Sequence, residues 1–209
     1  MQRTKARDST VLYLSERLRA QLDRIRSYPV TIVEAPSGFG KTTAVTAYLH
    51  AAPQRDARVL WYTAMGESGR KAWSGICELA SRIDPACADR LLRLGLPTQD
   101  QLSEVVSLLR DMHCDQETFF VVDNFQHYQG MLPNGFVNAF SSHDHPNFHV
   151  ILLTRQIEAD GYAAAASRLV LKLTSDVFFF NREDVRAYFQ CAGIQLPSDE
   201  LDRIMRTTE

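Results

Sequence analysis

Residues 30–43 read VTIVEAPSGFGKTT, and this stretch decides the fold. Its first five residues predict a buried strand, and a loop containing Gly38 and Gly40 follows before a helix begins near Lys41. The spacing of Gly40, Lys41 and Thr42 is that of a phosphate-binding loop, or P-loop. Glycines let the backbone turn its N–H groups toward phosphate oxygens, and the N-terminus of the helix adds positive potential. The sequence therefore predicts a strand, a phosphate-binding loop and a helix, in this order.

The residue types of the loop indicate a nucleotide ligand. We expect the ligand to be ATP or ADP, with Lys41 neutralising the β- and γ-phosphates and the Thr42 hydroxyl facing Mg²⁺. Ala35 occupies the position where a P-loop usually has its first glycine, and alanine is tolerated there if its φ is negative. A match of this length can also arise by chance or from a structural turn. A second element of a nucleotide-binding site is therefore needed to support the prediction. The residues expected to contact the nucleotide are Pro36, Ser37, Gly38, Phe39, Gly40, Lys41, Thr42 and Thr43.

Residues 117–124, ETFFVVDN, supply that second site. Four apolar residues that end in Asp123 predict a fully buried strand with a carboxylate at its carboxyl end, where open α/β sheets bind ligands. In a P-loop protein such an aspartate holds Mg²⁺ opposite the hydroxyl that Thr42 provides here. A strand-terminal aspartate can instead be a cap or turn residue. We therefore expect Thr42 and Asp123 to form the magnesium site.

A third strand is predicted over residues 148–155, FHVILLTR, with Arg155 at its carboxyl end. An arginine in that place can sense whether a γ-phosphate is present and can stabilise its charge. The alternative is a surface arginine that pairs with a nearby acid. His127 is a further candidate for approaching the phosphates, although a surface loop position is the favoured interpretation.

Three histidines, His143, His145 and His149, lie close together in the sequence. No cysteine or carboxylate stands near them at a ligand spacing, so we interpret them as a polar turn followed by a strand, and not as a metal site.

The remaining pattern alternates strands with helices, which is typical of a parallel sheet. A helix near the N-terminus carries apolar residues at helical intervals, and its role is either a wall for the nucleotide base or simple packing. Further strands are predicted over residues 58–64 and 169–173, and helices over residues 11–25, 41–51, 73–83 and 99–112, with a short helix and loops in residues 84–98.

Composition limits the class of protein. The chain of 209 residues is 45% hydrophobic, and its 25 acidic and 23 basic residues give a net charge of −2, so no overall positive charge indicates nucleic-acid binding. The four cysteines are widely and irregularly spaced, which fits neither a disulfide framework nor a zinc site. No apolar run reaches the length of a membrane span, and the charged N-terminus lacks an apolar core behind it. We therefore expect a cytoplasmic protein without a membrane partner.

The motifs together resemble the ATPase region of the large LuxR-type, maltose-regulator-like transcriptional regulators, which belong to the signal-transduction ATPases with numerous domains (STAND). The resemblance is carried by PSGFGKTT as Walker A, by the Walker B strand that ends in Asp123, by Thr154 and Arg155, and by residues 175–189, SDVFFFNREDVRAYF. It covers nearly the whole chain, from LSERL at residues 14–18 to the end.

This resemblance implies an α/β fold, a P-loop NTPase with a parallel five-stranded sheet flanked by helices. The P-loop strand is expected to lie between strands four and five, and a small helical or winged-helix module is expected to follow. In that family the nucleotide state controls opening and self-association, and a DNA-binding helix-turn-helix lies far downstream.

One residue departs from the family pattern at the candidate catalytic site. Members generally carry a second acid directly after the Walker B aspartate, and this chain has Asn124 there. An amide can orient water but cannot accept its proton, so nucleotide binding is expected to persist while hydrolysis is weakened. The candidate catalytic residues are Lys41, Asp123, Asn124 and Arg155.

The C-terminal stretch is expected to begin a second module. Asn181 can cap a helix with Asp184 at its third position, Gly193 can end that helix, and another helix starts near Ser198 and still runs at the end of the chain. We therefore expect a P-loop NTPase domain over residues 1–175 and the beginning of a helical or winged-helix module over residues 176–209. The simplest interpretation is an N-terminal fragment of a longer regulator.

Three functions remain open at this stage. The favoured one is an ATP/ADP-dependent switch that requires Mg²⁺, self-associates in the full-length protein, responds to an unknown small-molecule or protein inducer, and reaches DNA only through a domain absent from this chain. The alternative is an enzyme with rapid turnover, either an ATPase or a small-molecule phosphotransferase. The third is a protein-interaction platform in which nucleotide is structural or the loop is vestigial.

Overall fold

A computed structural model describes residues 13–51, 56–158 and 168–207. Five parallel strands form one sheet in the order β2-β3-β4-β1-β5. This order confirms the predicted fold class and the position of the P-loop strand between the fourth and fifth strands. The strands are β1 (Val30–Glu34), β2 (Arg58–Thr63), β3 (Thr118–Asp123), β4 (Phe148–Thr154) and β5 (Val170–Leu173).

The central strands owe their position to their apolar sequences. Every residue of β3 and of β4 is buried, as expected for strands of a parallel sheet that helices cover on both faces. Strand β2 lies at the edge of the sheet, and only its Leu60 is fully buried. The apolar runs thus place β1, β3 and β4 inside, so that their carboxyl ends meet at one edge of the sheet.

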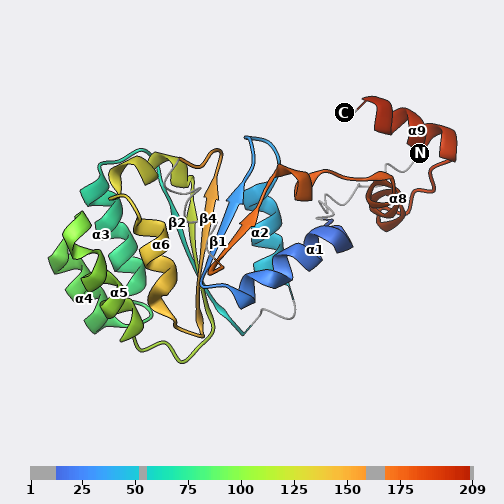
Figure 1. The fold of residues 1–209 in the computed structure, drawn as a ribbon. Helices are drawn as coiled ribbons and strands as arrows, with labels where there is room; N and C mark the ends of the chain where they lie inside the picture. The colour runs from blue at the N-terminus through green and yellow to red at the C-terminus, as the bar shows by residue number, and fades with distance from the viewer. Residues whose placement is uncertain (1–12, 52–55, 159–167, 208–209) are drawn as a thin grey trace, which may run out of the picture.

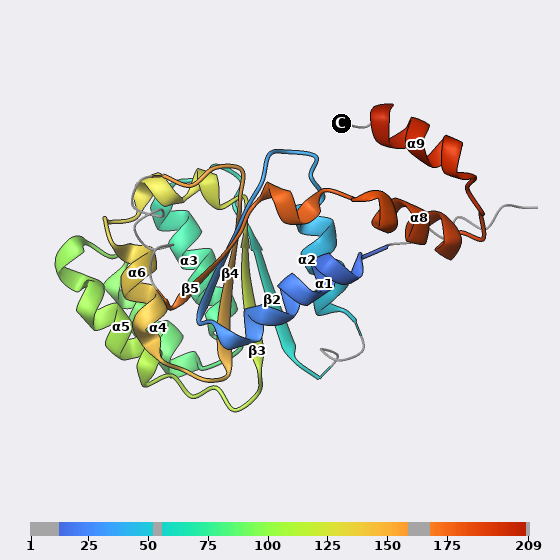
Figure 2. The ribbon, with the colours of Figure 1, turned by 45° about the vertical axis from the view of Figure 1, so that its right-hand side comes forward.

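Helices cover the two faces unequally (Figure 1; Figure 2). Helices α1 (Glu16–Asp23) and α2 (Lys41–Leu49) pack on one face, where Leu22, Ile25 and Tyr48 are fully buried. The other face carries α3 (Gly69–Ala80), α4 (Pro85–Leu94), α5 (Leu102–Arg110) and α6 (Phe136–Phe140). Short 3₁₀ turns are η1 (Arg24–Ser27), η3 (Gln99–Gln101), η4 (Phe125–His127), η5 (Gln129–Met131), η6 (Ser141–His143) and η7 (Ser175–Phe178).

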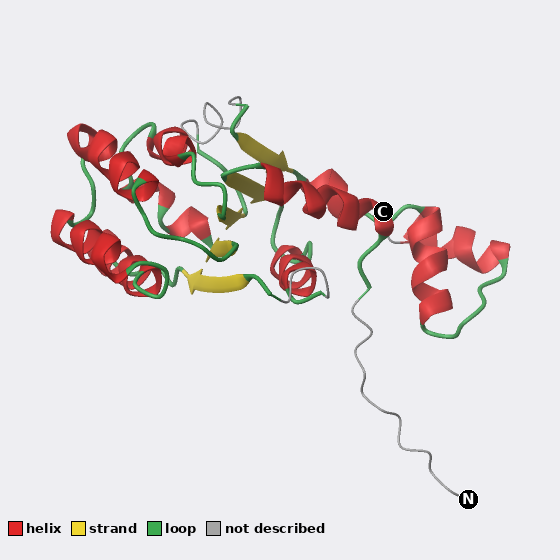
Figure 3. Cartoon of the chain, turned by 90° about the horizontal axis from the view of Figure 1, so that it is seen from below, coloured by secondary structure: helices red, strands yellow, loops and turns green. Residues whose placement is uncertain are grey.

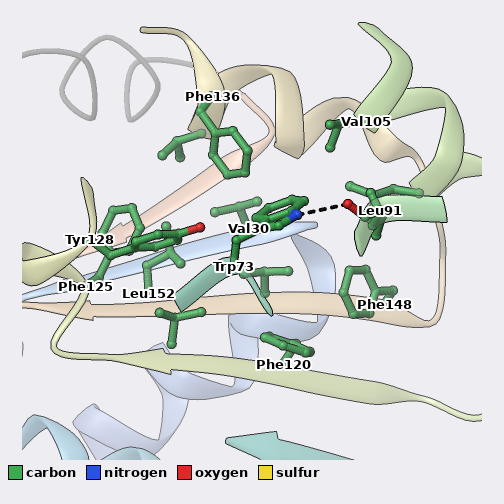
Figure 4. Close-up of a cluster of buried hydrophobic side chains, with 14 of the residues drawn as sticks. Val30, Trp73, Leu91, Val105, Phe120, Phe125, Tyr128, Phe136, Phe148 and Leu152 are labelled. Atoms are coloured by element: carbon green, nitrogen blue, oxygen red, sulfur yellow. Dashed lines mark hydrogen bonds between the residues drawn. The ribbon is translucent and has the colours of Figure 1, made fainter. Parts of the chain in front are cut away.

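The larger core lies between the sheet and helices α3 to α6 (Figure 4). Trp73 is at its centre, where its ring meets Phe136 edge to face with centroids 6.4 Å apart. The indole Nε1–H donates a hydrogen bond of 3.0 Å to the Leu91 carbonyl oxygen, so its one polar group is satisfied inside the core. This hydrogen bond also ties α3 to α4.

The helical predictions differ from the structure at several boundaries and miss one helix. The helix predicted over residues 73–83 corresponds to α3, which begins at Gly69 and ends at Ala80. The helix predicted over residues 99–112 is divided into η3 and α5, and α5 ends at Arg110.

The N-terminal helix begins at Glu16, because the Ser15 hydroxyl accepts the Leu18 N–H at 3.2 Å and caps it there. The expected start at residue 11 is therefore wrong for residues 13–15, while residues 11 and 12 lie outside the described part. Helix α6 was not predicted, because five residues are too few to show a helical period.

The chain leaves the sheet after β5 and forms two helices, α8 (Arg182–Cys191) and α9 (Ser198–Thr207), that lie to one side of the main body (Figure 3). The predicted capping box is present, since the Asn181 side chain accepts the Asp184 N–H and the Asp184 side chain accepts the Asn181 N–H. Leu201 of α9 is fully buried, and Arg182 forms an ion pair with Asp202. The two helices therefore pack as a pair.

Among the described residues, no helix is long and apolar enough to cross a membrane, and no three His, Cys, Asp or Glu side chains are grouped to hold a metal ion. Of the three neighbouring histidines, His149 places its Nδ1 3.0 Å from the Tyr28 carbonyl oxygen. His143 is fully buried, and its Nδ1 accepts the His145 N–H at 2.9 Å. Burial lowers the pKa of His143 to about 4.

We expect His143 to make the protein less stable in mild acid. The unfolded chain binds a proton on this ring near pH 6.5 and the folded chain only near pH 4, so the free energy of unfolding falls as the pH drops through that window. The loss from this group is at most roughly 3 kcal/mol. Denaturant unfolding at several pH values should show a shallower decline in His143→Gln than in the parent protein. The exposed His127→Gln serves as control, and equal slopes in all three proteins would contradict this role.

Candidate nucleotide-binding site

The loop after β1 has the backbone that its sequence predicts. Gly38 and Gly40 adopt φ values of 88° and 75°, which side chains other than glycine rarely accept. Helix α2 starts at Lys41, so its N-terminus faces the loop. Ala35 is buried, does not have a positive φ, and donates its N–H to the Thr154 carbonyl oxygen at 3.2 Å. The structure therefore meets the condition under which alanine replaces the first glycine.

The ammonium group of Lys41 lies within its own loop. Its Nζ donates to the carbonyl oxygens of Ala35 at 2.5 Å and of Pro36 at 3.0 Å. Burial lowers the pKa of Lys41, the positive charge of Arg155 lowers it further, and the negative charge of Asp123 opposes both. The carbonyl oxygens therefore hold this cation at the place where phosphates would meet it.

Thr42 and Asp123 meet as the sequence predicts. The Thr42 hydroxyl donates a hydrogen bond of 3.1 Å to Asp123 Oδ2, and the Asp123 side chain is almost fully buried. One hydroxyl and one carboxylate suit Mg²⁺, which keeps most of its water ligands and takes few oxygens from a protein. These two residues would hold the ion, and its charge would offset that of the phosphates.

Asn124 follows directly and takes a left-handed backbone conformation with φ 56°. Its N–H donates to Asp123 Oδ1 at 2.8 Å, and its side-chain Nδ2 lies 3.5 Å from the Ala64 carbonyl oxygen. Asparagine enters this backbone region more readily than most residues. The amide is therefore fixed at the end of β3 in a form that cannot take a proton from water.

Arg155 follows β4 and lies at the same edge of the sheet. Its backbone N–H donates to Gln126 Oε1 at 3.2 Å, and its side chain is exposed at the cleft. Gln126 was missed by the sequence analysis because a neutral amide in a turn carries no distinctive signal. His127 is exposed and is not among the residues that line the cleft, so the alternative of a surface loop position holds.

One cleft gathers most of the predicted residues. The two that do not line it are Pro36, whose carbonyl oxygen accepts from Lys41, and Phe39, whose ring packs against Phe179 with centroids 5.4 Å apart. The lining comprises Ser37, Gly38, Gly40, Lys41, Thr42, Thr43, Asp123, Asn124, Gln126, Leu153 and Arg155. Its cations, hydroxyls and backbone N–H groups suit a bound polyphosphate, while Asp123 suits the accompanying metal ion.

The parallel sheet, the glycine loop and the Thr42–Asp123 pair define a P-loop NTPase. The family model described as AAA domain matches residues 24–161. The chain therefore belongs to the AAA domain family, which implies nucleotide binding, typically with Mg²⁺.

Sequence comparison gives distant relatives among transcriptional regulators. The chain is 22% identical over 196 residues to the HTH-type transcriptional regulator MalT of Yersinia enterocolitica, which covers 90% of this chain and 21% of the relative. It is 25% identical over 187 residues to MalT of Serratia proteamaculans, which covers 85% of this chain and 20% of the relative. The chain thus spans about a fifth of the length of these curated relatives.

A solved structure shares the fold at low sequence identity. It is a STAND protein with a tetratricopeptide repeat sensor from Pyrococcus horikoshii, with a TM-score of 0.56 and 14% identity. The match covers 93% of this chain and 28% of that chain. The likeness shows that the two chains share a fold.

Replacing Thr42 by alanine should weaken the binding of Mg–ATP. The variant loses one oxygen ligand of Mg²⁺. If that contact is worth as much as a hydrogen bond to a charged group, about 1.5–3 kcal/mol, affinity should fall by roughly tenfold to a hundredfold. Titration calorimetry in Mg²⁺ and in EDTA distinguishes a contact to the metal ion from a contact to the phosphates. The loss of affinity should occur only in Mg²⁺. Thr46→Ala, one turn further along α2 and outside the cleft, is the control. An equal loss in EDTA would assign Thr42 to the phosphates instead.

Proposed function

We propose that this chain is the ATP- or ADP-binding switch domain of a bacterial LuxR-type transcriptional regulator. The observation that carries the proposal is the contact between Phe39, at the tip of the P-loop, and Phe179, in the segment that leads to α8. A loop that holds phosphates thereby touches the part of the chain that leaves the sheet. Nucleotide state can therefore bias the position of the C-terminal helices.

Phosphate binding would change the conformation of the P-loop. Lys41 donates to the carbonyl oxygens of Ala35 and Pro36, and a phosphate would compete for that ammonium group. Phe39 stands between Gly38 and Gly40, whose backbone freedom lets a small change in the loop redirect the ring. The aromatic contact with Phe179 is the element through which this change would reach α8.

A second connection supports the coupling. Arg17 of α1 donates to the carbonyl oxygens of Asp176 at 3.1 Å and of Phe179, and its guanidinium lies 3.9 Å from the Asp184 carboxylate. The segment from η7 to α8 is thus held by α1 as well as by the P-loop. A switch requires that ATP and ADP bind two arrangements with different affinities, and these contacts are the ones that would differ.

The proposed roles in nucleotide binding follow from the cleft. Residues 37–43 hold the phosphates, Thr42 and Asp123 hold Mg²⁺, and Arg155 senses the γ-phosphate. Asn124 orients water without accepting its proton, so hydrolysis is slow and suits a switch better than an enzyme with rapid turnover. A turnover ATPase or a small-molecule phosphotransferase is the alternative that phosphate-release kinetics would distinguish.

The proposal also concerns the domain boundaries and the longer regulator to which this chain would belong. We place the P-loop NTPase domain over residues 1–175 and the start of a helical or winged-helix module over residues 176–209. The likeness to the MalT regulators supports a cytoplasmic protein that self-associates, responds to an inducer, and reaches DNA through a region outside this chain.

The first test is the nucleotide content of the purified protein. Chromatography of the nucleotide released by denaturation should find ADP or ATP in the parent protein and little in Lys41→Ala, because the variant loses the cation at the phosphates. A timed phosphate-release assay should show slow hydrolysis. Rapid multiple turnover would favour the enzyme alternative. Absence of nucleotide, together with no binding on addition, would leave only an interaction platform.

The second test concerns the Phe39–Phe179 contact. Hydrogen exchange in α8 should differ between the ADP-bound protein and the protein bound to a non-hydrolysable ATP analogue. An aromatic pair contributes about 0.5–1.5 kcal/mol, so Phe39→Ala should shrink this difference by roughly twofold to tenfold.

Phe180→Ala is the matched control, because Phe180 contacts Tyr13 and Tyr188 and belongs to the same segment. It should preserve the nucleotide-dependent difference. If Phe39→Ala binds both nucleotides and retains the full difference in α8, the coupling does not run through this contact.

A further inference from the structure

We propose that Gln126 contacts the γ-phosphate and thereby lets the cleft distinguish ATP from ADP. The proposal rests on the proposed nucleotide-binding function and names a residue that the P-loop and Walker B motifs do not contain.

Gln126 is held toward the cleft by two aromatic residues of the same turn, one directly before it and one two positions after it. Phe125 and Tyr128 are buried in the core, with ring centroids 6.5 Å apart in an edge-to-face arrangement (Figure 4). Because both rings point into the core, the turn has little freedom to move. Gln126 is only partly buried and lines the same cleft as Lys41 and Arg155.

The side chain of Gln126 bridges the ends of two neighbouring strands. Its Oε1 accepts the Arg155 N–H at 3.2 Å, beyond the end of β4, and its Nε2 donates to Asn124 Oδ1 at 3.4 Å, beyond the end of β3. A side-chain amide nitrogen carries two N–H groups, and the bond to Asn124 uses one of them. The second N–H can therefore donate to an anion in the cleft.

In the proposed complex, the partner of this amide would be the third phosphate of ATP. The loop backbone and Lys41 would hold the β- and γ-phosphates, and the γ-phosphate would also face Asp123 and Arg155, which line the same cleft. ADP ends before that place. Gln126 is hydrogen-bonded to Asn124 and to the Arg155 backbone. A hydrogen bond from Gln126 to a γ-oxygen would therefore fix the positions of both residues when ATP is bound.

The chain provides a matched comparison in Gln129. Its Nε2 donates to the Gln156 carbonyl oxygen at 3.0 Å, and its Oε1 accepts the Glu158 N–H at 3.4 Å. Gln129 thus also joins the connection after β3 to the chain after β4, but it does not line the phosphate cleft. A purely structural bridge would behave alike at both positions.

The experiment measures dissociation constants of the full chain for Mg–ADP and for a non-hydrolysable Mg–ATP analogue. Gln126→Ala should weaken the ATP analogue by about tenfold and change ADP by less than about twofold, because one hydrogen bond to a charged oxygen is lost. Gln129→Ala should leave the ratio of the two constants unchanged. Gln126→Glu should lower the affinity for the ATP analogue further, because a carboxylate repels the γ-phosphate.

The outcomes separate this inference from the proposed function. Parent protein that binds neither nucleotide would overturn the proposed function, and the role of Gln126 with it. Parent protein that binds both, with an unchanged ratio in Gln126→Ala, would overturn only the role of Gln126. An equal shift of the ratio in Gln126→Ala and Gln129→Ala would assign the effect to loop packing and would also overturn it.

Discussion

The site depends on the convergence of three strand ends at one edge of the sheet. Strand β4 lies between β1 and β3, so the loop after β1, the carboxylate at the end of β3 and the chain after β4 come together above it. The hydrogen bond of 3.1 Å from Thr42 to Asp123 closes this arrangement between residues 81 positions apart. Arg155 directly follows the intervening strand β4, and its position in the chain is enough to place it in the same cleft.

The sequence predicts this convergence well because two strong rules act together. Buried parallel strands are mostly apolar, which marks β1, β3 and β4. Ligands bind at the carboxyl ends of such strands, which selects Asp123 and Arg155. Gln126 and Leu153 carry no such mark, since a neutral amide or an aliphatic side chain occurs in any turn or strand. Their place in the cleft follows from tertiary packing, which one sequence alone does not reveal.

Helix α1 packs on the sheet through the apolar residues that its sequence places at helical intervals. Leu18, Leu22 and Ile25 are buried against the face that α2 also covers, so apolar packing explains its helical period. Arg17 lies outside that stripe and binds the segment that leads to α8. One side of α1 therefore packs on the sheet, and another side holds the segment that leads to the C-terminal helices.

The proposed switch needs more coupling than one aromatic contact supplies. Coupling free energies between sites are about 1–3 kcal/mol, and an aromatic pair such as Phe39 with Phe179 gives about 0.5–1.5 kcal/mol. A partly exposed ion pair such as Arg17 with Asp184 adds about 0–1 kcal/mol. Both contacts hold the chain between β5 and α8, so their contributions would act on one movement. The coupling in such a switch is therefore shared between the P-loop and α1, and either contact alone would transmit only part of the nucleotide signal.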